Sequence, residues 1–153
     1  MTLYVLALLI GVVAGLRTMT APAAMSWAAH LGLTPVAGTP LSFMAAAPTA
    51  WIFTVLALGE FVADQLPRTP SRKAPFAFGG RIVSGALCGA VIGAADGALA
   101  AGLLLGVVGA IIGTLGGYEA RMRLARLFGR DLPAALIEDF IAIAGALLIV
   151  RAL

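Results

Sequence analysis

Five of the seven acidic residues lie within or directly after strongly apolar stretches of the sequence. Glu60 and Asp64 are four residues apart in one stretch, Glu138 and Asp139 are adjacent in another, and Glu119 follows a third. Residues four apart on a helix share a face, and carboxylate oxygens bind protons and hard cations. These positions predict an acidic site for an ion or a proton.

The alternative is that the carboxylates within the helices only hold helix ends in place, by pairing with arginines. The candidate partners are Arg68, Arg72, Arg81 and Arg121. A charged side chain at the centre of a membrane helix costs about 2.5–3.5 kcal/mol even on a lenient scale, so a function is the default interpretation. We favour function for Glu60, Glu138 and Asp139. For Asp64 and Glu119, which are expected close to water, we favour pairing.

Arg17 and Arg81 are the candidate counter-charges or gates of this site. Arg17 follows an apolar stretch that begins at Leu3, and the helix rise places it roughly 21 Å from the start of that stretch. We therefore expect Arg17 to lie far from Glu60 and to pair with Asp96 or with outer head groups. An anchored helix end is an equally open interpretation of Arg17.

A basic, proline-rich loop offers a second site, for a phosphate or a lipid head group. An arginine fork matches phosphate oxygens, and lysine adds a point charge. Nearby carboxylates suit Mg²⁺, which leaves a metal open. The alternative is a polybasic loop attracted to anionic lipid. The candidate ligands in the loop are Arg68, Thr69, Ser71, Arg72 and Lys73.

Recognisable catalytic chemistry is missing from the sequence. It contains no Walker loop, HExxH motif, nucleophile elbow or paired-histidine motif. The single cysteine, Cys88, is expected to pack as a small apolar residue, and the lone His30 to lie in a loop or at an interface. This argues against an enzyme, and we expect no cofactor.

The composition identifies a membrane protein. Hydrophobic residues make up 61% of the 153 residues and charged residues 11%, and the mean hydropathy is +1.06. Soluble domains are about half apolar and a quarter charged. Because a span needs about 20 residues, the chain allows about five spans in a single transmembrane domain, residues 1–153, with no room for a separate soluble domain.

The fold class predicted from these stretches is all-α, a polytopic transmembrane helix bundle. After the first helix, residues 22–31 form either a short interfacial or re-entrant helix, with Thr20 as its cap, or the continuation of one helix kinked at Pro22. The last helix is expected to begin with Asp131 as its cap. The expected spans are residues 3–16, 43–66, the two arms of a hairpin over residues 80–117, whose second helix runs on into the basic segment that follows, and 132–153.

Between Gly80 and Gly117, glycines recur at a spacing of four in three runs. The runs are Gly85, Gly89, Gly93 and Gly97, then Gly102 and Gly106, then Gly109, Gly113 and Gly117. On a helix this spacing places them on one face, where a neighbouring backbone can approach closely, as in the small-xxx-small pattern of membrane helices. The stretch is too long for one crossing, and Asp96-Gly97 is its polar break. We therefore predict a glycine-zipper helical hairpin that turns there.

Positive charge sets the predicted orientation. Basic residues concentrate in the loop after residue 66 and in the segment after Gly117, so both are expected in the cytosol. Five crossings then place the N-terminus inside and the C-terminus outside. The helix rise puts Glu60 and Glu138 about 8–9 Å beneath the cytosolic edge, so acids from different helices are expected to gather at one depth.

The sequence also resembles a known family. It carries Gly59-Glu60, an ADxLPxTPSR run over residues 63–72 and a glycine-rich helix over residues 81–90. In these features it resembles a bacterial family of small multi-pass membrane proteins filed under domains of unknown function. The resemblance runs through nearly the whole chain. It implies an integral bundle in the bacterial inner membrane and supplies no activity.

These observations favour a transporter or channel for a small ion or solute. A lipid-phosphate binding protein or enzyme at the cytosolic face is the first alternative, and a structural membrane subunit is the second. The expected partners are membrane lipids, the small ion or solute and further copies of the chain, with no nucleic acid.

Overall fold

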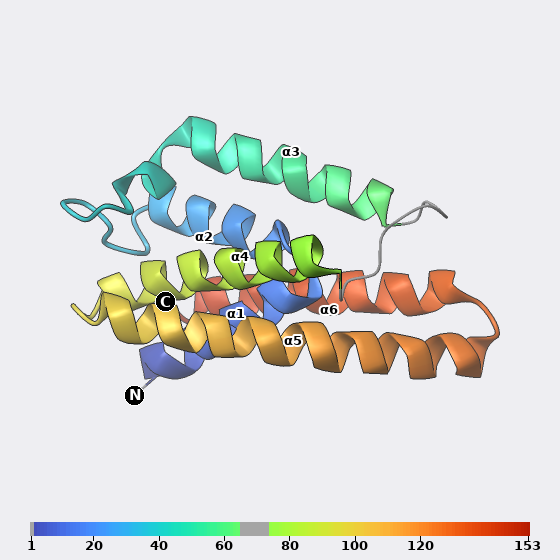
Figure 1. The fold of residues 1–153 in the computed structure, drawn as a ribbon. Helices are drawn as coiled ribbons and strands as arrows, with labels where there is room; N and C mark the ends of the chain where they lie inside the picture. The colour runs from blue at the N-terminus through green and yellow to red at the C-terminus, as the bar shows by residue number, and fades with distance from the viewer. Residues whose placement is uncertain (1, 65–73) are drawn as a thin grey trace.

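The structure is a computed structural model and describes residues 2–64 and 74–153. Within these ranges the chain forms six α-helices and one short 3₁₀ helix, and it contains no strand (Figure 1). The all-α prediction is therefore confirmed. The elements are α1 (Thr2–Leu16), α2 (Thr20–His30), η1 (Ser42–Ala45), α3 (Ala47–Ala63), α4 (Pro75–Ala94), α5 (Leu99–Phe128) and α6 (Asp131–Arg151).

Three helices, α4, α5 and α6, are long and apolar enough to cross a membrane. The apolar helices α1 and α3 are shorter, with 15 and 17 residues. Helix α2 has 11 residues, and would run only about 16 Å against a hydrocarbon core of about 30 Å. The fold thus has three helices that could cross a membrane, and the five predicted crossings stay a prediction.

Successive helices run in alternating directions, and this corrects the predicted topology. Helix α1 crosses the bundle and α2 returns beside it, so that the start of α1 and the end of α6 lie at the same end (Figure 1). We expected the two termini on opposite sides. The physical reason for the difference is the chain reversal between Leu16 and Thr20, which adds one change of direction.

Helix α2 is a separate element and not the continuation of a kinked α1. Thr20, Pro22, Met25 and Ser26 are buried, so α2 packs inside the fold and does not lie on its surface. Its Trp27 indole Nε1 donates a hydrogen bond of 3.0 Å to Thr54 Oγ1 on α3. Of the two alternatives for residues 22–31, the kinked helix is therefore wrong.

Helix α5 packs against α4 on one side and against α1 on the other. A Cβ atom added at Gly89 of α4 would lie 2.8 Å from Cα of Gly106 on α5, and one added at Gly113 of α5 would lie 2.9 Å from the carbonyl carbon of Val12 on α1. Carbon atoms do not approach so closely, so only glycine fits. The predicted hairpin turn is confirmed, and Gly97 in it has φ +67°.

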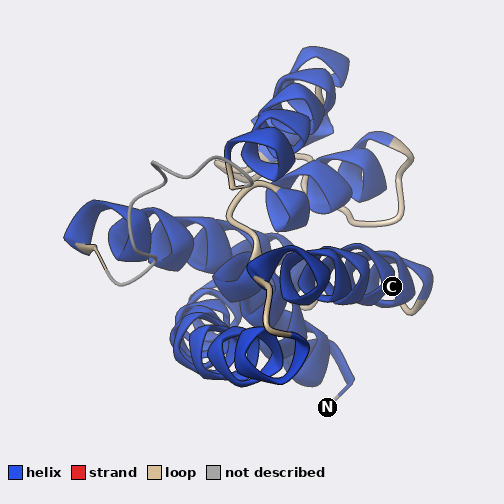
Figure 2. Cartoon of the chain, turned by 90° about the vertical axis from the view of Figure 1, so that its right-hand side faces the viewer, coloured by secondary structure: helices blue, strands red, loops and turns tan. Residues whose placement is uncertain are grey.

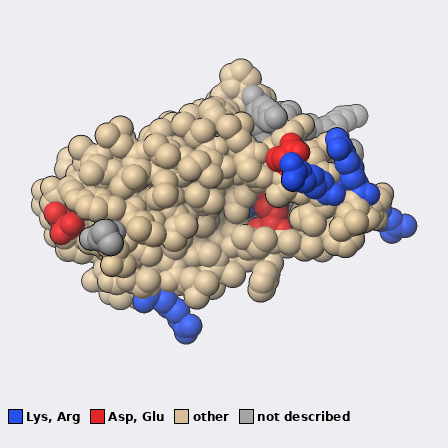
Figure 3. Space-filling view, turned by 90° about the horizontal axis from the view of Figure 1, so that it is seen from below, with Lys and Arg blue, Asp and Glu red and all other residues tan. Residues whose placement is uncertain are grey.

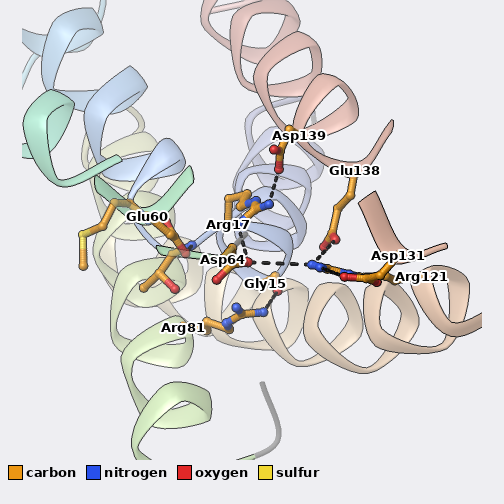
Figure 4. Close-up of polar contacts among 11 residues, drawn as sticks. Gly15, Arg17, Glu60, Asp64, Arg81, Arg121, Asp131, Glu138 and Asp139 are labelled. Carbon is orange, nitrogen blue, oxygen red and sulfur yellow. Dashed lines mark hydrogen bonds and ion pairs between the residues drawn. The ribbon is translucent and has the colours of Figure 1, made fainter. Parts of the chain in front are cut away.

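Helix α3 lies at the edge of the bundle, over α2 (Figures 1 and 2). Only Ala50 and Ala57 of this helix are buried, and most of its large apolar side chains are exposed. The side chains that hold the C-terminal end of α3 against the bundle are polar. Its last turns carry Glu60 and Asp64 toward the point where α1 gives way to α2 (Figure 4).

Candidate functional site

Arg17 is the first residue after α1 and lies at the centre of a buried group of charges. Its side chain is 0% exposed, and its guanidinium forms ion pairs with Asp64 at the end of α3 and with Asp139 on α6 (Figure 4). The guanidinium carbon lies 5.4 Å from the centroid of the Phe61 ring. One arginine thus joins three segments that are distant in the sequence.

Glu60 supplies the cap that α2 lacks. Its Oε1 accepts a hydrogen bond from the backbone N–H of Thr18 and its Oε2 one from that of Met19, both at 2.8 Å. The predicted cap, Thr20, is instead the first residue of the helix, and the N-cap Met19 makes no side-chain capping bond. The carboxylate also meets the positive end of the α2 dipole.

The other backbone groups of the chain reversal are satisfied by α4 and α5. The carbonyl oxygen of Gly15 accepts hydrogen bonds from Arg81 Nη1 at 2.8 Å and from Thr114 Oγ1 at 3.3 Å. Ser84 Oγ donates to the carbonyl oxygen of Thr18 at 2.6 Å. Buried backbone groups outside a helix need hydrogen-bond partners, and here side chains supply them.

Arg121 extends the charged group along α5. Its Nε donates a hydrogen bond of 2.9 Å to Asp131 Oδ1, and its Nη1 lies 3.6 Å from Glu138 Oε2 and 3.8 Å from Asp64 Oδ2. The prediction that Asp131 caps the last helix is wrong, because Arg130 occupies the N-cap and no side-chain cap bond forms there. We call the following residues the Arg17 cluster: Arg17, Glu60, Asp64, Arg81, Arg121, Glu138 and Asp139.

The structure brings together four of the five predicted acids. Glu60, Asp64, Glu138 and Asp139 all belong to the Arg17 cluster (Figure 4). Glu119 does not, because it is exposed and pairs with Arg123 one turn further along α5, at 3.2 Å. Whether any of these carboxylates binds an ion or a proton stays a prediction.

Arg17 was expected near Asp96 and far from Glu60, and the structure places it near Glu60 instead. Its predicted partner Asp96 is exposed in the α4–α5 turn, at the other end of the bundle. The helix rise from Leu3 was sound, but α1 begins at the end opposite Glu60. The length of α1 therefore brings Arg17 close to the acids and does not separate it from them.

Arg81, the second predicted counter-charge, does reach the cluster. It is 4% exposed and donates to the end of α1. The predicted phosphate ligands Arg68, Thr69, Ser71, Arg72 and Lys73 lie outside the described residues, so that site stays a prediction.

Sequence reasoning missed Ser84 and Thr114 as members of this region, whereas Arg121 was among the arginines predicted to pair with the carboxylates. The structure places Arg121 within 3.8 Å of Asp64 and 3.6 Å of Glu138, so these two predicted pairings are confirmed. Ser84 and Thr114 occupy positions of small residues in apolar helices, where a hydroxyl often bonds the backbone four residues earlier. Thr114 Oγ1 does this to the carbonyl oxygen of Ala110 at 2.7 Å.

No group of three or more His, Cys, Asp or Glu side chains in the described ranges is arranged to hold a metal ion. Cys88 is buried with a free thiol. His30 Nδ1 lies 2.9 Å from the carbonyl oxygen of Ala45, so this nitrogen already has a local partner.

Two cavities lie in this part of the fold. One, of about 300 Å³, lies between α5 and α6 and reaches Arg121 and Glu138. The other, of about 610 Å³, lies between α4 and the α2–α3 pair and reaches Met19 and Ser84. Both are lined mainly by apolar groups, and only the first is lined by residues of the Arg17 cluster.

The fold and site together define a class, an all-α membrane-type bundle with a charged cluster buried at the junction of two short helices. Comparison with known proteins adds no family to this description: no protein-family model matches the chain, and no curated protein or solved structure matches it either.

Replacing Glu60 with glutamine tests the capping role of this carboxylate. A glutamine carbonyl can accept from only one of the two N–H groups, and the favourable charge at the α2 N-terminus is lost. We expect the free energy of unfolding to fall by about 1–2 kcal/mol, measured by denaturation in detergent. Glu119→Gln, at an exposed surface pair, is the control and should change it by less than about 0.5 kcal/mol. Equal effects of the two variants would contradict the capping role.

Proposed function

We propose that this protein is a membrane transporter or channel for a small ion or solute, and that the Arg17 cluster is its proton- or cation-binding site. One observation carries the proposal. Two carboxylates from different helices, Asp64 of α3 and Asp139 of α6, share a single buried arginine.

Because Asp64 and Asp139 share Arg17, one of the two carboxylates can bind a proton or a cation while the other stays paired. A buried charge that loses its partner is costly. Here Asp139 can bind a proton or a cation while Asp64 keeps Arg17 paired, and the reverse exchange is equally possible. The cluster can therefore change its charge by one without stranding Arg17.

The backbone around the site supports the same proposal. In many transporters the binding site is formed by broken helices, whose N-terminal ends face anions and whose unwound carbonyls face cations. The α1–α2 junction has this form, with Glu60 at the start of α2 and Arg81 at the end of α1. The cavity between α5 and α6 provides space next to the cluster, because Arg121 and Glu138 line it.

We propose that the chain lies in the bacterial inner membrane with the α5–α6 turn in the cytosol. Arg121, Arg123, Arg126 and Arg130 precede or form this turn, which agrees with the positive-inside rule. Figure 3 shows most of the charged side chains of this face gathered toward one end, with an acidic group at the other end, a basic side chain at the lower edge and an uncharged surface between them. Both termini then lie outside, a revision of the predicted cytosolic N-terminus.

The glycine contacts of α1, α4 and α5 would act as a glycine zipper.

Proton flux in liposomes tests the proposal. We expect the protein to raise proton flux above that of empty liposomes under an imposed potential, and Asp139→Asn to lower this flux at least tenfold, because it removes the exchangeable charge and leaves Arg17 paired with Asp64. Glu119→Gln is the control and should match the wild type. Wild-type flux in Asp139→Asn, or no flux from the wild type with H⁺, Na⁺ or K⁺, would contradict the proposal.

A structural membrane subunit is the second candidate, and one observation favours it. Each carboxylate of the Arg17 cluster has a partner in the fold: an arginine for Asp64, Glu138 and Asp139, and two backbone N–H groups for Glu60. A cluster that only fastens helices would show a loss of stability in Asp139→Asn without any flux to lose.

A further inference from the structure

The cavity between α5 and α6 is an apolar slot that opens at the side of the bundle. Val12 and Leu16 of α1 form its inner wall, and Ile137 and Ile141 of α6 one of its sides. Its lining on α5 runs from Ile112 to Leu124, a length of about 18 Å at the helix rise. The slot is therefore long and narrow, the shape that an extended hydrocarbon chain fills.

Glycines keep the floor of the slot open. Gly116 lines the slot, and a Cβ atom added there would meet no atom within 4 Å. Three residues earlier, Gly113 is in contact with the α1 backbone, and a Cβ atom there would lie 2.9 Å from the carbonyl carbon of Val12. Gly113 is thus required for helix packing, whereas Gly116 faces empty space.

Positive charge lies beyond one end of the slot. Arg121 lines that end, held by Asp131 and Glu138. Further along, Arg126 in the last turn of α5 and Arg130 before α6 are exposed, and neither forms an ion pair with a residue of the described ranges. These two arginines are available to an anionic group at the level of the α5–α6 turn.

We propose that the slot binds one acyl chain of an anionic phospholipid of the surrounding membrane, with its phosphate at Arg126 and Arg130. The apolar walls suit the hydrocarbon, and the arginines suit a phosphate, which they bind through their planar fork. This inference does not rest on the proposed transport function. It gives the protein a lipid site remote from the basic loop in which the sequence suggested one.

Native mass spectrometry of the full-length protein, released from bilayers of equal phosphatidylglycerol and phosphatidylethanolamine, tests the site. We expect one retained phosphatidylglycerol per chain. Gly116→Leu should lower this retention at least tenfold by filling the slot, and Arg126→Gln with Arg130→Gln should lower the preference for phosphatidylglycerol at least fivefold. Gly59→Leu is the matched control, because Gly59 lies on α3 and is equally open to an added side chain; it should retain the lipid.

Three results would overturn the proposal. Full retention in Gly116→Leu would place the lipid elsewhere, and equal retention of both phospholipids would exclude recognition of an anionic head group. Stronger retention of an added fatty acid than of phosphatidylglycerol would exclude the phosphate contact. If Gly116→Leu fails to fold, Ile137→Trp fills the same slot from α6 and is judged by the same criterion.

Discussion

Replacing Arg17 with methionine is expected to lower the free energy of unfolding by about 3–5 kcal/mol, the cost of removing one partner from a buried charge pair. The effect falls mainly on Asp139, because Arg17 is the only cation among the described residues within 4.0 Å of that carboxylate. Denaturation of the purified protein in detergent measures the loss. Arg123→Met, at an arginine whose side chain is 76% exposed, is the control and should cost less than about 0.5 kcal/mol.

A second substitution separates lost charge pairing from lost packing. If the cost of Arg17→Met comes from an unpaired Asp139, then adding Asp139→Leu should recover part of the loss, since a neutral apolar replacement of a buried pair is often nearly as stable as the pair itself. The coupling energy of this double-mutant cycle should reach about 1–3 kcal/mol. Additive effects would show that the two side chains contribute independently and that Arg17 is not the partner on which Asp139 depends.

The apolar helices were predictable because their ends carry strong local signals. Asp96-Gly97 interrupts the glycine-rich stretch, and α4 and α5 indeed end and begin around it. Gly129 ends α5 with φ +67°, a conformation that suits glycine. The gathering of Glu60 with Glu138 and Asp139 followed from the positive charge in the connections, which places the end of α3 and the start of α6 at the same end of the bundle.

The position of Arg17 was not predictable from local signals. Residues 20–30 have the composition of a kinked continuation of α1 as much as that of a returning helix, and Pro22 is compatible with both. What decides between them is the carboxylate of Glu60, forty residues away, which satisfies the N–H groups of Thr18 and Met19. One unrecognised reversal changed the direction assigned to α1 and with it the depth of Arg17.

Replacing Gly113 with leucine is expected to prevent the isolation of folded protein. A Cβ atom there already overlaps the Val12 backbone, so α1 must move away from α5 to admit any side chain. Overpacking of a close contact costs about 1–3 kcal/mol for small insertions and more where the backbone must shift. The expected result is loss of the monodisperse species in size-exclusion chromatography, with Gly113→Ala destabilised by about 3 kcal/mol in denaturation.

Gly116→Leu makes the prediction specific. It places the same side chain on the same helix one turn away, where no atom lies within 4 Å of the added Cβ, so folded protein should be recovered in wild-type yield.

A displacement of α1 in Gly113→Ala should also weaken the Arg17 cluster, because Arg17 directly follows α1 and its pairs with Asp64 and Asp139 depend on the position of that helix. Arg17→Met should therefore cost less in a Gly113→Ala background than in the wild type. Equal costs in both backgrounds would show that the glycine contacts and the charged cluster are independent.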